Sequence, residues 1–322
     1  VTLMSVAIIT LVVNVALALR RVPKRDVIWA AIATGLTFLS ITLIAGALLA
    51  GNLEQGYLGV WRVRVLTMHL HMALLGWVFV MIIGISHRLL PMFLLAHNTN
   101  TKWTRRALAL TATGVPLLAI GLVSPPTLPY VPISWIGATL IEAGIGCFLT
   151  QAVLFFRSRK RPKLDAGLRH AATAVGFLLI AALLAPFVLA GGIAHRHLDI
   201  VYMLIGLLGG ISLYVTGQFY KIVPFLAWMA RFKDDMGRKP VPMIAQLYSA
   251  RVAHIDLALF ISGIVGMAIG VIAREAIIVR VSACLFTIAV VLFASQMIRV
   301  AFGTSFGNAP SAGPPQSRIL IR

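Results

Sequence analysis

Long apolar segments, separated by polar or basic linkers, run along almost the whole chain. Nine of them are long enough to cross a lipid bilayer as an α-helix, which needs about 20 apolar residues. Their approximate limits are 1–19, 28–50, 66–90, 106–123, 131–156, 168–190, 198–223, 252–273 and 278–300. Several linkers are short, which favours antiparallel packing of neighbouring helices. The pattern predicts an all-α bundle of about nine transmembrane helices over residues 1–300, followed by a flexible cytoplasmic tail over 301–322.

The composition supports a membrane protein and argues against a nucleic-acid-binding one. Hydrophobic residues make up 60% of the chain and charged residues only 11%, and the mean hydropathy is +0.95. The formal net charge is +19, but the Lys and Arg residues stand between the apolar segments. In such positions they determine topology and contact anionic lipid headgroups. Cys147 and Cys284 both lie inside apolar segments, so we interpret them as buried, inert thiols.

The basic residues also predict the orientation of the chain. When the linkers are assigned alternately to the two sides of the membrane, 23 of the 28 Lys and Arg residues fall on one side. Because cytoplasmic loops carry most Lys and Arg residues, we expect the N-terminus outside and the C-terminus in the cytoplasm. The linkers 157–169 and 221–251 would then face the cytoplasm.

The third apolar segment opens with two histidines, in the run His69-Leu-His71. Residues i and i+2 are about 200° apart on an α-helix, so the two imidazoles leave on nearly opposite faces. Imidazole is a common axial ligand of haem iron, and ionisable side chains inside a membrane are usually functional. No carboxylate nearby in the sequence could neutralise His71. We therefore expect a haem-bearing helix, with His71 as the main candidate ligand.

Part of the third segment recurs in the seventh. Residues 74–91 align without gaps on residues 207–224 at an offset of 133, which matches Gly76 with Gly209. The second copy also follows a His-x-His pair, but that pair lies seven residues further upstream than the offset predicts. Two interpretations stay open: an internal duplication, or a shared local design of small residues for close helix packing.

The eight histidines divide into two layers, because spans three and seven run in the same direction. The outer layer holds His69, His71, His195 and His197. The inner layer holds His87, His97, His170 and His254. A helix rises about 24 Å between residues 71 and 87, so the two layers cannot share one haem. We interpret His97 and His170 as headgroup-level residues, and His195 as a surface residue or a contact to a haem propionate.

Few other polar side chains lie inside the apolar segments. Glu142 stands in the middle of the fifth span, where a carboxylic acid is a possible proton relay or a hydrogen-bonded neutral group. Asp199 and Asp256 each follow a histidine by two residues. Either carboxylate could accept a hydrogen bond from the N–H of a ligating imidazole.

The run from His69 to Pro91, with Gly76-Trp77-Val78 and His87-Arg88 inside it, resembles the tenth helix of the haem–copper oxidase catalytic subunit. The nearest branch is that of the C-type oxidases and nitric-oxide reductases. The resemblance covers about 25 residues, and more loosely about 30 others around 195–228. It implies that His69 binds a high-spin haem and that His71 binds a low-spin haem.

The sequence departs from that family in two respects. It has nine spans rather than twelve, and it contains no adjacent His-His pair, from which the family builds its copper site. We therefore expect a shortened relative with one or two b-type haems, no copper and no oxygen reduction. In this hypothesis His71 pairs with His197 as a bis-imidazole haem site, and His69 and His195 are secondary candidates.

The expected function is electron transfer within a larger respiratory or related redox complex in a bacterial or archaeal cytoplasmic membrane. Partners would be other membrane subunits and cytochrome c or quinol. One alternative is a nitric-oxide or oxygen reductase with an open haem at His69. Another is a haem-free structural or transport subunit. A haem absorption spectrum would separate the last alternative from the others.

Overall fold

A computed structural model describes residues 2–97, 100–124, 130–160, 162–191 and 196–303. Within these ranges the regular elements are helices, and nine of the helices are long and apolar enough to cross a membrane. The prediction of an all-α bundle with nine spans is confirmed, and the protein is an integral membrane protein by these criteria. The orientation of its termini stays a prediction.

Seven spans are single α-helices. They are α1 (Thr2–Arg20), α2 (Val27–Gln55), α5 (Lys102–Val123), α6 (Tyr130–Arg157), α7 (Ala166–Gly191), α10 (Ala250–Ala273) and α11 (Ala276–Phe302). Local signals fix several of their ends. Asp26 caps α2 by accepting hydrogen bonds from the backbone N–H groups of Ile28 and Trp29, at 3.0 and 2.9 Å. Gly56 ends the same helix with a φ of 66°, a left-handed conformation that glycine adopts without strain.

The third and seventh spans are longer and share an irregularity. Each is a continuous rod whose middle is π-helical rather than α-helical. The third consists of α3 (Arg62–His71), η2 (Met72–Phe79) and α4 (Val80–Leu94). The seventh consists of α8 (Arg196–Met203), η4 (Leu204–Ser212) and α9 (Leu213–Phe232). Because π-helical segments are rare and often occur at functional sites, the middle turns of these two rods are candidate positions for a functional site.

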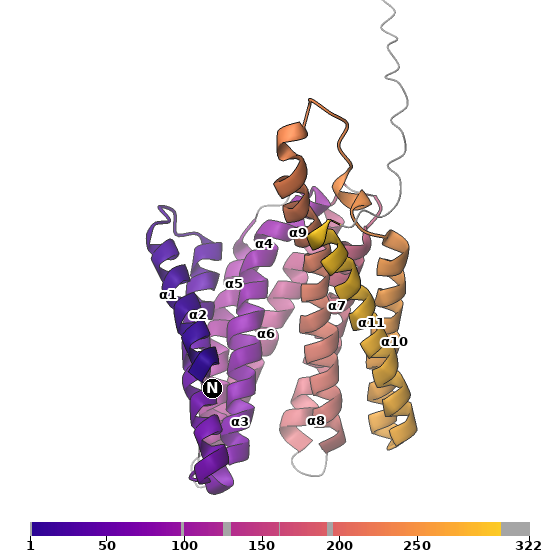
Figure 1. The fold of residues 1–322 in the computed structure, drawn as a ribbon. Helices are drawn as coiled ribbons and strands as arrows, with labels where there is room; N and C mark the ends of the chain where they lie inside the picture. The colour runs from indigo at the N-terminus through magenta and orange to yellow at the C-terminus, as the bar shows by residue number, and fades with distance from the viewer. Residues whose placement is uncertain (1, 98–99, 125–129, 161, 192–195, 304–322) are drawn as a thin grey trace, which may run out of the picture. The chain divides into compact units, whose positions relative to one another are not determined.

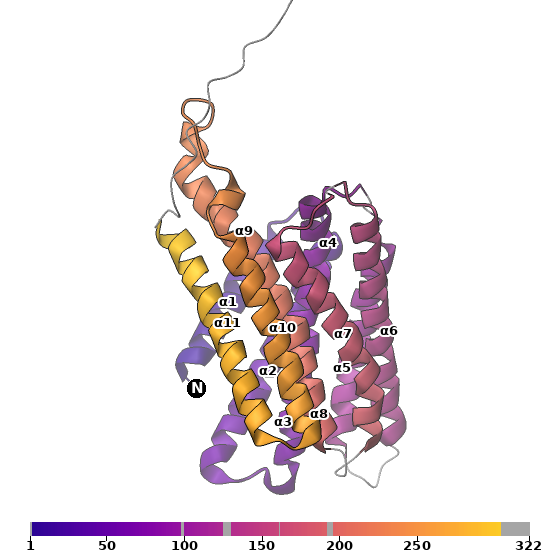
Figure 2. The ribbon, with the colours of Figure 1, turned by 90° about the vertical axis from the view of Figure 1, so that its right-hand side faces the viewer.

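The chain divides into two compact units. Unit 1 contains residues 1–163 and 174–211, and unit 2 contains residues 164–173 and 212–322. Helix α7 therefore belongs to both, with its first two turns in unit 2 and the rest in unit 1. In unit 1, α5 and α6 pack along their lengths; in unit 2, α10 and α11 do the same, as Figures 1 and 2 both show.

The two π-helical segments pack against their neighbours in the same way. A Cβ placed on Gly76 would lie 2.6 Å from Cγ of Phe38 on α2. A Cβ placed on Gly209 would lie 2.6 Å from Cγ of Phe177 on α7. In both places the absent side chain lets an aromatic ring of the preceding helix lie directly on the rod. The alignment of residues 74–91 with 207–224 is thus matched by equivalent packing.

The correspondence extends to the helices that follow each rod. Gly114 of α5 packs on the backbone of Gly137 of α6, and Gly263 of α10 packs on the backbone of Phe286 of α11. Positions 114 and 137 lie 149 residues before positions 263 and 286. A local pattern of small residues within one helix would not produce equivalent contacts between the next two helices. These contacts therefore favour duplication of a four-helix unit.

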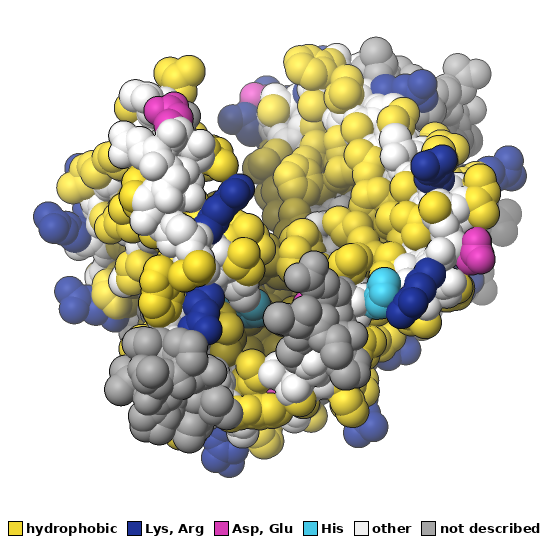
Figure 3. Space-filling model, turned by 90° about the horizontal axis from the view of Figure 1, so that it is seen from below, with side chains coloured by type: hydrophobic (Ala, Val, Ile, Leu, Met, Phe, Trp, Pro, Cys, Tyr) yellow, Lys and Arg dark blue, Asp and Glu magenta, His cyan; other side chains and the backbone are white. Residues whose placement is uncertain are grey.

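The outer surface of the helices is largely apolar, as a lipid-facing surface requires. Helix α1 contains no buried residue, and large hydrophobic side chains such as Leu183 and Phe187 are 63% and 64% exposed. Figure 3 shows hydrophobic side chains over much of the face that it displays, with Lys and Arg side chains more prominent than acidic ones.

Candidate functional site

His71 is the last residue of α3 and lies where the helix changes to π-helical geometry. Its Nδ1 atom is 2.8 Å from the carbonyl oxygen of Thr67, one turn earlier. A carbonyl oxygen only accepts hydrogen bonds, so Nδ1 carries the hydrogen and donates it. The Nε2 atom of the neutral imidazole then keeps its lone pair. Metal-binding histidines are commonly oriented in this way.

The side chain of His71 lines a pocket within unit 1. The other lining residues are Leu70, Leu74, Leu75, Phe79, Ile141, Glu142, Ile145, Leu178, Ala181, Ala182, Tyr202, Met203, Gly206, Leu207 and Ile211. They come from α3 and η2, from α6, from α7, and from α8 and η4. The pocket is therefore built around the start of both π-helical segments, and its walls are almost entirely apolar.

The atom-free space of this pocket is about 690 Å³ when its open side is included, and the centre of a water molecule can reach about 60 Å³ of it. The small volume that the centre of a water molecule can reach shows that the apolar side chains approach one another closely. A flat macrocycle would therefore have to contact them on both faces.

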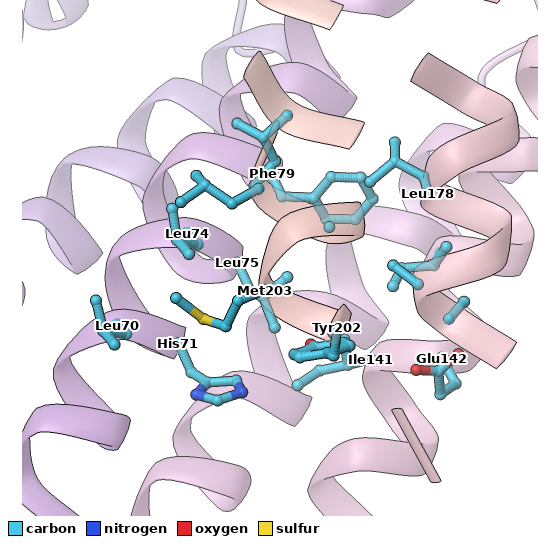
Figure 4. Close-up of a pocket in the computed structure, with 16 residues that line it drawn as sticks. Leu70, His71, Leu74, Leu75, Phe79, Ile141, Glu142, Leu178, Tyr202 and Met203 are labelled. Carbon is cyan, nitrogen blue, oxygen red and sulfur yellow. The ribbon is translucent and has the colours of Figure 1, made fainter. Parts of the chain in front are cut away.

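Two further polar side chains face the pocket together with His71. The ring of Tyr202 is stacked on the imidazole of His71, with ring centroids 6.5 Å apart and an angle of 17° between the planes. Glu142 comes from α6, and in Figure 4 Tyr202 lies between His71 and Glu142. The pocket thus combines one potential metal ligand, one phenol and one carboxyl group within apolar walls.

His69 lies on the other side of the helix, as its two-residue separation from His71 predicts. Its imidazole packs on α2, where a Cβ on Gly46 would lie 3.0 Å from Cε1 of His69. The Nδ1 atom of His69 is buried and has no hydrogen-bond partner among the described residues. The expectation that the two imidazoles leave on different faces is confirmed.

The second His-x-His pair is less well placed for the pocket. His197 is exposed, at the start of α8, and is not one of the residues that line the pocket. His195 lies outside the described residues. At the offset of 133, the positions equivalent to His69 and His71 are instead Tyr202 and Leu204. Asp199 is half-buried one turn before the pocket-lining residues of α8.

The four inner-layer histidines have different environments. His97 and His254 are exposed. His87 is half-buried, its Nδ1 atom lies 2.8 Å from Oγ1 of Thr104 on α5, and its ring lies 5.6 Å from that of Phe155. His170 has no exposed surface. The side chain of His170 is packed and hydrogen-bonded inside unit 2, so it does not contact lipid headgroups from the surface of that unit; its depth in the membrane stays a prediction.

His170 belongs to a buried polar cluster that links four helices of unit 2. Its Nδ1 atom donates to the carbonyl of Ala166 at 2.8 Å, and its Nε2 atom lies 3.1 Å from Oδ1 of Asp256. The hydroxyl of Tyr220 donates to Oδ2 of Asp256 and accepts from Nε2 of Gln296 at 3.0 Å. All four side chains of this cluster are at most 1% exposed.

The donor and acceptor pattern of this cluster fixes its charge. Since Nδ1 of His170 faces a carbonyl oxygen, its second nitrogen and Asp256 share one further proton. The pair is either an imidazolium with a carboxylate or an imidazole with a carboxylic acid, and both are neutral overall. A neutral, fully hydrogen-bonded pair is the form in which ionisable groups are tolerated inside an apolar bundle.

Sequence reasoning anticipated Asp256 as an acceptor for an imidazole but assigned it no partner on another helix. The partner is His170, which lies 86 positions away in the chain. Tyr220 and Gln296 were not expected in this role. The available signal was the presence of an aspartate inside an apolar span, which requires polar partners on neighbouring helices.

Among the described residues, no three His, Cys, Asp or Glu side chains converge in a way that could hold a metal ion. The expectation that copper is not bound stays a prediction, as does each haem ligand assignment. Comparison with protein-family models and with curated proteins finds no match for this chain. The likeness to the haem–copper oxidases accordingly depends on the motif around His69 and His71.

Proposed function

We propose that this protein is an integral-membrane b-type haem protein that transfers electrons within a larger redox complex. One observation carries the proposal: His71 directs an unprotonated Nε2 atom toward an apolar pocket between the helices of unit 1. When bound, a b-type haem supplies one-electron oxidation and reduction at its iron.

In this proposal His71 is one axial ligand. The hydrogen bond from its Nδ1 atom to Thr67 fixes the ring and its tautomer, so that no reorientation is needed for binding. The apolar walls would surround the macrocycle with hydrocarbon. Tyr202 of α8 holds its ring nearly parallel to the imidazole, with ring centroids 6.5 Å apart.

We propose His197 as the second axial ligand. It stands on the rod that also brings Tyr202 and Met203 to the pocket, and it precedes Tyr202 by five residues. Two imidazole ligands leave no open position on the iron, which favours electron transfer over gas chemistry. Partners of the complex would be other membrane subunits and cytochrome c or quinol, in a bacterial or archaeal cytoplasmic membrane.

A nitric-oxide or oxygen reductase with an open haem is the second candidate. It is favoured by one observation: the side chain stacked on His71 is the phenol of Tyr202, whereas His197 is exposed. In that case Tyr202 and Glu142 would face the open side of the site, where a carboxyl group could deliver protons.

Absorption spectroscopy of the protein purified from haem-replete cells tests the first proposal. The wild type should show the spectrum of a b-type haem, and His71→Ala should abolish it. His97→Ala is the matched control, because His97 is exposed and outside the pocket. A haem-free wild type, or an unchanged spectrum in His71→Ala, would contradict the proposal.

Carbon monoxide then distinguishes the two candidates. If His71 and His197 both bind the iron, the reduced wild type does not bind carbon monoxide, and His197→Ala does. If the wild type already binds carbon monoxide, the open-haem reductase is the better assignment.

A further inference from the structure

Two side chains between α5 and α6 in unit 1 bury polar atoms that have no hydrogen-bond partner among the described residues. Thr111 has no exposed surface, and Gln151 is 3% exposed. Neither the hydroxyl of Thr111 nor either amide atom of Gln151 has a hydrogen-bond partner among the described residues. Buried polar groups in folded proteins are nearly always hydrogen-bonded, to protein or to ordered water, so these atoms require an explanation.

The packing of α5 on α6 places these two side chains along one line. A Cβ on Gly144 of α6 would lie 2.5 Å from Oγ1 of Thr111, so these residues face each other. Gln151 follows Gly144 by seven residues, which is about two helical turns, and thus projects from the same face. Because the two helices are antiparallel, Thr104 of α5 lies level with Gln151. We call the stripe formed by Thr104, Thr111 and Gln151 the polar seam.

One end of the polar seam reaches His87. The Oγ1 atom of Thr104 is 2.8 Å from Nδ1 of His87, and Phe155, one turn after Gln151, contacts the same imidazole. A threonine hydroxyl can make further hydrogen bonds in addition to this one. His87 is half-buried and lies in the layer predicted to be near the cytoplasmic face.

The other end of the polar seam approaches the pocket. Gly114, three residues beyond Thr111 on α5, packs on Ile141, whose Cγ1 atom would lie 2.9 Å from a Cβ at that glycine. Ile141 and Ile145 also line the pocket, and Figure 4 shows Ile141 beside Tyr202. About 60 Å³ of the pocket is wide enough for water, and a single water needs about 10–15 Å³.

The duplicated helices supply an internal comparison. At the offset of 149 that relates α5 and α6 to α10 and α11, the residues of the polar seam correspond to Ala253, Phe260 and Val300. All three are buried. The same helix pair therefore packs well with apolar side chains, and packing alone does not require Thr111 or Gln151 in unit 1.

We propose that the polar seam binds a file of water molecules that connects His87 with the pocket. Water both donates and accepts hydrogen bonds, as the amide of Gln151 and the hydroxyl of Thr111 require, and it brings no charge into the apolar bundle. The hydrated seam gives the pocket a route for water and protons from the His87 end. This proposal concerns the protein alone and does not depend on haem binding.

Radiolytic hydroxyl labelling of the full-length protein in lipid nanodiscs detects the bound water, because buried side chains are labelled only where water lies beside them. Phe155 lies one turn after Gln151, and Phe260 occupies the position of unit 2 that corresponds to Thr111; both are buried, at 1% and 5% exposure. Phe155 should be labelled at least about tenfold faster than Phe260, and Gln151→Leu should remove that difference, since the water loses two partners. Equal labelling in the wild type, or a difference that survives Gln151→Leu, would overturn the proposal.

A second measurement does not depend on labelling. Thr42 of α2 also has a buried hydroxyl without a partner among the described residues, and it lies outside the polar seam. Thr42→Val should leave the midpoint of thermal unfolding unchanged or raise it, as removal of an unpaired hydroxyl does. Thr111→Val should give a lower midpoint than Thr42→Val, because it strips a partner from bound water. A midpoint for Thr111→Val at or above that of Thr42→Val would contradict a hydrated seam.

Discussion

Two groups of buried polar side chains, one in each unit, differ in whether the protein itself supplies their hydrogen-bond partners. In unit 2, His170, Asp256 and Tyr220 bond to one another, and every polar atom that they bury in this cluster has a partner. In unit 1, His71 directs a nitrogen into a pocket, and Gln151 has two amide atoms without a partner among the described residues. The helix pairs α5–α6 of unit 1 and α10–α11 of unit 2 pack in equivalent ways, so the difference lies in the side chains rather than in the packing of these helices.

This difference separates a structural role from a binding role. A polar group that is satisfied by its own protein stabilises the fold, and a further ligand would have to displace an existing hydrogen bond. A polar group that is buried without a protein partner is stabilised when a ligand or a water molecule supplies the missing hydrogen bond. The cluster in unit 2 therefore links helices, whereas the polar groups of unit 1 are those to which our binding proposals apply.

The largest effect is expected from breaking the cluster in unit 2. Asp256→Ala leaves His170 and Tyr220 buried without their shared acceptor, and should reduce the free energy of unfolding by about 3–5 kcal/mol. Unfolding in mixed detergent micelles, followed by circular dichroism, measures the change. Asp199→Ala is the control at a half-buried aspartate of unit 1. A loss of less than about 1 kcal/mol would show that the cluster is not a structural link.

A smaller effect is expected at the two equivalent glycines. Gly76→Ala and Gly209→Ala each push a methyl group into the ring of a phenylalanine, and each should cost about 1–3 kcal/mol. Gly146→Ala is the control, because a Cβ there would contact nothing within 4 Å. Similar losses at both glycines are expected from duplication of the unit. A loss of unfolding free energy at only one of the two glycines would show that their packing is not equivalent.

The smallest effect on stability is expected at the pocket. Glu142 faces the pocket rather than a partner helix, so Glu142→Gln should change the free energy of unfolding by less than about 1 kcal/mol. The same unfolding measurement as for Asp256→Ala allows a direct comparison. A loss as large as that of Asp256→Ala would show that Glu142 has a structural role, and would remove the contrast between the two units.

The sequence alone was sufficient for the fold class. Apolar segments of membrane-spanning length are a strong signal, since a bilayer forces the backbone to satisfy its hydrogen bonds within each helix. The i, i+2 geometry also separated His69 from His71 correctly, because the angle between residues on a helix does not depend on tertiary contacts.

Contacts between distant helices were less predictable. His170 is 86 positions from Asp256, and nothing in either local sequence specifies which neighbouring helix will face it. The burial of His170 was missed for the same reason, because basic neighbours in the linker suggested a surface position. The duplication was visible in one helix but became persuasive only when the packing of Gly114 and Gly263 could be compared.

The division of α7 has a consequence for biogenesis. Unit 1 is completed by residues 174–211, which follow the first segment of unit 2 in the chain. The pocket in turn draws its lining from as early as Leu70 and as late as Ile211. During synthesis, the ribosome must therefore have passed residue 211 before the pocket can close, after the first six spans have already entered the membrane. Until that moment the inserted helices expose His71 and Glu142 within the bilayer.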